Sequence, residues 1–89
     1  MARVFVKLPV GMTTSAGESA VECEARTVAE ALDLAVAADP RLKPRIFRED
    51  GRMWAGVFLN GRNVNALGGL SAVLDDGDKL SVVPPISGG

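Results

Sequence analysis

The sequence predicts an α+β roll: a mixed sheet of about five strands with one main helix across one face. Alternating apolar residues near both ends of the chain are typical of strands, and a single stretch changes to helical periodicity. The expected order is two strands, one helix and then three strands. Because the chain has 89 residues, it can fill one core and not two.

The first two strands are expected to form a hairpin. Residues 3–8 alternate, so that Val4, Val6 and Leu8 share one face. Residues 9–17 are rich in glycine, threonine and serine and predict a loop. In residues 19–24, Val21 and Cys23 face the core, where cysteine usually behaves as a small hydrophobe.

The helix has a recognisable start and stop. Thr27 is followed three residues later by Glu30, which is a capping-box pattern. Asp39-Pro40 predicts the end, since proline disfavours helical geometry in the residue before it. Between them, one stripe of the helix is apolar and is expected to face the sheet: Val28, Ala31, Leu32 and Ala35.

The segment after the helix is basic. Residues 41–50 predict a loop with one short helical turn, anchored by Leu42, Ile46 and Phe47. We interpret its positive charge as a solvated surface rather than a partner contact. The cationic side chains are Arg41, Lys43, Arg45 and Arg48.

Asn60-Gly61 predicts a tight hairpin, because both residues tolerate positive φ. It joins residues 57–59 to a return strand that continues through Val64. A turn at residues 76–78 then precedes the last strand, residues 79–83. The first and last strands are expected to be parallel neighbours at the centre. The expected core is Val4, Val6, Leu32, Val57, Leu59, Leu80 and Val82.

Composition excludes several function classes. The chain has no histidine and one cysteine, so it offers neither a histidine-based acid/base site nor a usual zinc or iron–sulfur site. A net charge of −1 gives no case for binding nucleic acid or an anionic membrane. No segment reads as a signal peptide or a membrane span, and we expect a cytoplasmic protein.

The C-terminal sequence DGDKLSVVPPISGG resembles the signature of the small subunit of molybdopterin synthase. It is similar more distantly to the thiamine-pathway sulfur carrier and to ubiquitin. The stretch TVAEALDLAVAADPRLKPRIFREDG resembles archaeal ubiquitin-like small modifiers, and LGGLSAVLDDGD is similar to the carrier that feeds a sulfhydrylase in actinobacterial cysteine synthesis. The resemblance covers nearly the full chain and implies a ubiquitin-like β-grasp fold in residues 1–83, followed by a flexible reactive tail in residues 84–89.

The resemblance also implies a mechanism. An adenylyltransferase related to ubiquitin-activating enzymes, which itself uses ATP and Mg²⁺, would adenylate the carboxyl group of Gly89, and a sulfur donor would convert it to a thiocarboxylate. A synthase would then accept the sulfur: the large subunit of molybdopterin synthase, or a cysteine synthase. The chain would bind no cofactor and would not be an enzyme. The alternatives are a protein modifier joined to lysines through Gly89, and a plain interaction module with an inert tail.

The tail itself suits insertion into a partner. Six residues span at most about 20 Å. Pro84-Pro85 ends the last strand and favours an extended conformation, while Gly88, without a Cβ, lets a narrow channel close on the backbone. Ile86 and Ser87 would also lie against the partner.

Strand parity predicts a docking face beside the tail. Phe5, Phe58 and Val83 should point outward from the sheet, and exposed aromatic residues beside a reactive tail suggest a protein interface. If the register were shifted by one residue, the phenylalanines would instead lie in the core.

Overall fold

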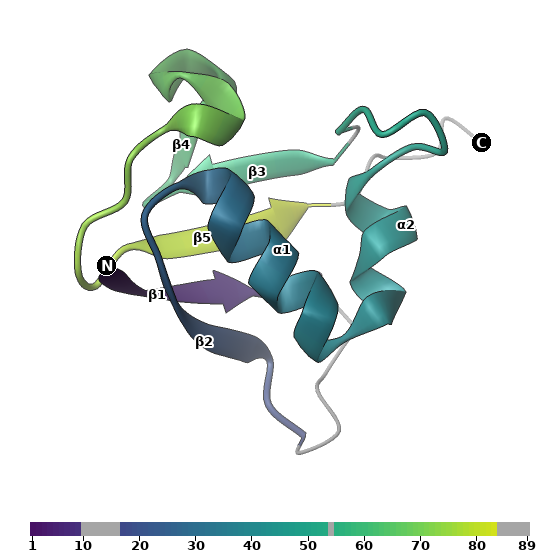
Figure 1. Cartoon of the computed structure of the whole chain (residues 1–89), viewed down its shortest axis with the longest axis horizontal. Coiled ribbons are helices and arrows are strands. Elements are labelled where there is room, and N and C mark those ends of the chain that lie inside the picture. The colour runs from purple at the N-terminus through teal and green to yellow at the C-terminus, as the bar shows by residue number, and fades with distance from the viewer. Residues whose placement is uncertain (10–16, 54, 84–89) are drawn as a thin grey trace.

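The computed structural model describes residues 1–9, 17–53 and 55–83, and it confirms the predicted β-grasp roll. One helix, α1, crosses one face of a five-stranded sheet of order β2-β1-β5-β3-β4 (Figure 1). Among these residues, no helix is long and apolar enough to cross a bilayer.

The elements are β1 (Ala2–Lys7), β2 (Ala20–Ala25), α1 (Val28–Ala38), α2 (Lys43–Ile46), β3 (Gly56–Leu59), β4 (Arg62–Asn63) and β5 (Lys79–Val83), with 3₁₀ turns at Pro40–Leu42, Val64–Leu67 and Gly69–Ser71.

The first and last strands are parallel neighbours, as predicted. Val6 of β1 pairs with Leu80 of β5, while β1 pairs on its other side with β2, antiparallel. On the opposite side, β5 pairs antiparallel with β3, where Val57 faces Val82. The strand that leads to the C-terminal residues is therefore at the centre of the sheet.

The core lies between the sheet and α1. Val4, Val6, Leu32, Val57, Leu80 and Val82 are 0–3% exposed. Leu59 is the exception to the predicted core, since it is only half-buried. It pairs with Arg62 of β4, and this two-residue edge strand covers it incompletely.

The predicted helix boundaries are confirmed by hydrogen bonds. The Glu30 N–H donates to Thr27 Oγ1 at 3.3 Å, and the Glu30 side chain accepts from the Arg26 N–H at 2.7 Å. At the other end, the Asp39 N–H donates to the Ala35 carbonyl. The Arg41 guanidinium, hydrogen-bonded to Asp39, holds the pKa of that carboxyl below its usual value.

The predicted short helical turn after α1 is present as α2, and its predicted anchors Leu42 and Ile46 are buried. A 3₁₀ turn at Pro40–Leu42, which was not predicted, precedes it. One connecting segment differs from expectation. Val64 does not continue the return strand. It starts a 3₁₀ turn instead, because the Asn63 side chain accepts from the Asn65 N–H at 2.9 Å and caps that turn.

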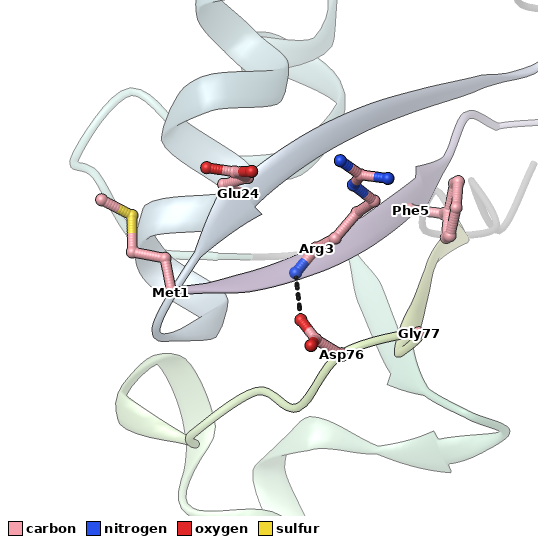
Figure 2. A pocket seen from close by; sticks show the side chains of 6 residues that line it. All are labelled: Met1, Arg3, Phe5, Glu24, Asp76 and Gly77. Carbon is pink, nitrogen blue, oxygen red and sulfur yellow. Dashed lines mark hydrogen bonds between the residues drawn. The ribbon is translucent and has the colours of Figure 1, made fainter.

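The turn before β5 is tied to β1 through the backbone. Gly77 has φ +86°, which favours glycine, and its N–H donates to the Arg3 carbonyl at 2.8 Å. The Arg3 N–H donates to Asp76 Oδ1 at 2.8 Å (Figure 2), and the Phe5 N–H donates to the Asp78 carbonyl at 3.0 Å. These bonds fix where β5 starts relative to β1.

Asn60 ties the start of β5 to the β3–β4 hairpin. It has φ +50°, in keeping with the predicted turn. Its Nδ2 donates to Asp78 Oδ1 at 2.9 Å, and its Oδ1 accepts from the Lys79 N–H at 3.0 Å. The sequence predicts the turn but not this second role of the side chain.

Burial of β5 should make Leu80 costly to truncate. Leu80→Ala should lower the free energy of unfolding by about 2–5 kcal/mol, because it leaves a cavity in the core. Urea denaturation followed by circular dichroism measures this. Val73→Ala, at a residue that is 73% exposed, is the control and should change stability by less than about 0.5 kcal/mol.

Asn60 should stabilise the protein through its side chain as well as its backbone. Asn60→Ala removes both hydrogen bonds and leaves a strained φ, so we expect a loss of about 1–3 kcal/mol in unfolding free energy. Asn60→Gly removes the bonds but relieves the strain and should lose less. If Asn60→Ala unfolds at the same denaturant concentration as the unchanged protein, the side chain does not anchor β5.

Candidate functional site

The predicted reactive residues, Gly88 and Gly89, lie outside the described residues, as do Pro84, Pro85, Ile86 and Ser87. The last described residue is Val83, which pairs with Gly56 at the end of β5. Since Leu80 and Val82 are buried, the strand that precedes the tail sequence is held firmly in the body.

The predicted outward parity of the docking residues is confirmed. Phe58 pairs with Ser81 and Phe5 pairs with Lys79, while Leu80 and Val82 point into the core. This register excludes the one-residue shift that would have placed both phenylalanines in the core. We call the face that carries Phe5, Phe58 and Val83 the outer sheet face.

Exposure differs among the three residues. Val83 is 48% exposed. Both phenylalanines are more buried than Val83, although neither is fully buried. Phe58 is covered on one side because its ring lies over Gly56: a Cβ built at Gly56 would be 3.1 Å from Phe58 Cε2. Glycine at this position therefore provides space for the ring, a role that strand alternation in the sequence does not reveal.

The three residues share this face but do not form one compact cluster. Phe58 and Val83 lie on adjacent strands near the end of β5. Phe5 lies on the other side of β5, opposite its first residue, Lys79. The backbones of Phe5 and Phe58 are two strand spacings apart across the sheet and two residues apart along it. Their Cα atoms are therefore separated by about 12 Å. The apolar pair at the last described residues of β5 is thus Phe58 and Val83.

Phe5 instead borders a shallow hollow at the start of β5 (Figure 2). Arg3 and Glu24 lie along the same hollow, and Arg3 Nε is 3.4 Å from Glu22 Oε1. Both partners of this ion pair are largely exposed, so its contribution to stability is small. This half of the outer sheet face is mainly charged.

Cys23 is separate from the outer sheet face. It is half-buried, packs against the core and lies on the inner side of β2, as the alternation predicts. Burial raises the pKa of its thiol, so that the protonated form is favoured at neutral pH. A protonated, half-buried thiol is a poor nucleophile.

Residues 6–89 match the ThiS family. Small archaeal modifier protein 1 of Haloferax volcanii is 43% identical over 65 residues, which are 71% of this chain and 70% of that protein. A protein of Archaeoglobus fulgidus whose given name assigns it as a sulfur carrier is 30% identical over 97% of this chain and 98% of its own length.

A solved structure supports the same relationship. A chain in the crystal structure of the BexX/CysO complex of Amycolatopsis orientalis is 33% identical. It covers 97% of this chain and 99% of its own length, with a TM-score of 0.78. The family match begins in β1, includes the whole of β5 and runs through Gly89. The chain therefore belongs to the ThiS family of ubiquitin-like, β-grasp sulfur carriers and small modifiers.

Proposed function

We propose that this chain is a cytoplasmic sulfur carrier that is adenylated and then thiocarboxylated at Gly89. The observation that carries the proposal is the family match, which continues past β5 through Gly88 and Gly89. The pairing and burial of β5 support it, because a strand held in the body would give the following six residues a defined starting point. Extended, those residues could reach about 20 Å into a partner enzyme.

The chemistry needs an activated carboxyl group. In the first step, the Gly89 carboxylate attacks the α-phosphorus of ATP on the activating enzyme, and pyrophosphate leaves. In the second, hydrosulfide attacks the carbonyl carbon, the bond to AMP breaks and AMP departs. Neither step is a redox reaction, and ATP and Mg²⁺ belong to the activating enzyme. The carrier supplies the carboxyl group and the docking surfaces.

The sulfur acceptor is proposed to be a biosynthetic synthase. The C-terminal sequence resembles the small subunit of molybdopterin synthase, which favours the large subunit of that enzyme as the acceptor. Residues 67–78 resemble the carrier of actinobacterial cysteine synthesis, which favours a cysteine synthase. A gene for either enzyme beside the gene for this chain would decide between them. In both cases, the outer sheet face near Phe58 and Val83 would lie against the partner.

A second candidate function is protein modification, which the 43% identity to a small archaeal modifier favours. The acyl-adenylate would be the same, but a lysine amine would replace sulfur as the nucleophile. The two functions predict different products: a free chain with one sulfur atom, or an isopeptide bond between Gly89 and a target protein.

Thiocarboxylation should appear as a change in intact mass. With its activating enzyme, Mg-ATP and sulfide, the chain ending at Gly89 should gain about 16 Da, since one oxygen is replaced by sulfur. Deletion of Gly89 should abolish the gain. Gly88→Val should suppress it, because a β-branched residue is bulky and restricts the backbone.

Cys23→Ser is the matched control and should keep the full gain. A gain of about 32 Da that persists after deletion of Gly89 and is lost in Cys23→Ser would instead identify a persulfide on Cys23, formed from sulfane sulfur that arises when air oxidises the sulfide. A chain that gains no sulfur but forms Gly89-dependent conjugates in a cell extract would favour the modifier.

Phe58 should contribute to binding of the activating enzyme. Phe58→Ala should weaken that complex by more than about 1 kcal/mol, because the ring is half-exposed beside Val83 at the end of β5. Calorimetric titration measures the affinity, and the melting temperature monitors the fold. Val73→Ala, an apolar truncation outside the outer sheet face, is the control. Equal affinities for both variants would exclude Phe58 from the interface.

A further inference from the structure

A second surface lies at the same end of the sheet as Val83, the last described residue. We call residues 40–53 the α2 platform, since α2 is at its centre. The Ala55 N–H donates to the Ile46 carbonyl at 3.3 Å, and Ala55 precedes Gly56, the partner of Val83. Figure 1 accordingly shows α2 at the end towards which the arrows of β1 and β5 point. The platform is thus beside the point where the chain leaves β5.

The α2 platform concentrates positive charge. It contains five of the ten cationic residues but only two of the eleven acidic ones. Arg41 is paired with Asp39 just outside the platform, which leaves Lys43, Arg45, Arg48 and Arg52 as its main positive charges. Lys43 and Arg45 are exposed on α2. Arg48 and Arg52 are also exposed and are held together by a tight turn, in which the Arg48 N–H donates to the Arg52 carbonyl at 2.7 Å.

The opposite end of β5 has the opposite charge. Asp75 and Asp76 are exposed in the turn that precedes the strand, and Asp78 follows them. The central strand therefore runs from an acidic turn to a basic platform. A charge distribution of this kind can orient the molecule as it approaches a charged partner.

The platform also has an apolar part. A shallow hollow is lined by Pro44 and Phe47 together with the charged residues Arg48, Glu49 and Asp50. Apolar groups surrounded by charged ones are typical of protein interfaces. Nucleic acid fits less well, since Glu49 and Asp50 at the hollow and the acidic turn would repel phosphates.

We propose that the α2 platform, which the sequence alone indicates to be a solvated surface, docks on an acidic surface of the activating enzyme that receives the tail. This proposal rests on the proposed function and adds the chemical character of the partner. Electrostatic attraction would bring the basic end of the carrier to the acidic surface. The end of β5 would then lie at the entrance to the partner's active site. Opposite charges would thereby speed association and set the orientation of the body.

The test is the association rate with the activating enzyme, measured as a function of salt. Lys43→Glu/Arg45→Glu should lower the rate constant by at least about tenfold at low ionic strength, and the difference should shrink as salt is raised. Arg26→Glu/Arg62→Glu makes the same change in net charge outside the platform and should change the rate less than about twofold. The neutral pair Lys43→Ala/Arg45→Ala should give an intermediate rate, and circular dichroism checks folding of each variant.

Three results would overturn the proposal. In the first, Lys43→Glu/Arg45→Glu and Arg26→Glu/Arg62→Glu associate with the enzyme at equal rates, while both still gain about 16 Da at Gly89. The platform is then not a docking surface, but the proposed function stands. Another is binding of the unchanged protein to an RNA oligonucleotide that is lost in Lys43→Glu/Arg45→Glu while enzyme association stays unchanged, which would assign the platform to nucleic acid. The third is an unchanged protein that neither binds the enzyme nor gains sulfur, which overturns both proposals.

Discussion

The parallel pairing of β1 with β5 is the constraint on which the rest of the molecule depends. It places the two strands that are farthest apart in sequence side by side at the centre of the sheet. Closing so long a connection costs conformational entropy, which burial of Val6 and Leu80 helps to offset. β5 is paired with β1 over residues 79–81 and with β3 up to Val83, so the body holds the strand up to its last residue.

Several polar contacts act on the same strand. The turn at Gly77 is bonded to Arg3 in β1, and the Asn60 side chain joins the β3–β4 hairpin to the first residue of β5. These bonds lie at the opposite end of β5 from the tail sequence. The strand is therefore anchored where it starts, while about half of its last residue, Val83, is exposed. The proposed carrier function would need this combination, since the body would have to stay folded while the end of the chain enters another protein.

The body and the tail divide the proposed function between them. A chain without histidine, whose one thiol is half-buried, offers few groups for catalysis, and family membership assigns it to carriers and modifiers. The body then contributes recognition. Two surfaces lie near the end of β5: the apolar pair Phe58 and Val83 on the outer sheet face, and the basic α2 platform. The first suits close packing and the second suits long-range attraction, which are different stages of one docking event.

The sequence by itself determined the local elements, the inward and outward parity of the strands and the ends of α1. Each of these depends on residues within a few positions of one another, such as Thr27 with Glu30, or Leu80 with Val82. The relation to sulfur carriers was also readable from the C-terminal sequence. Only the tertiary structure decided which strands are neighbours. It separated Phe5 from Phe58 by placing β5 between them, gave the Asn60 side chain partners at Asp78 and Lys79, and brought the α2 platform beside Val83. These relations join residues that are 18 or more positions apart, and a local pattern of side chains carries no information about strand order or register.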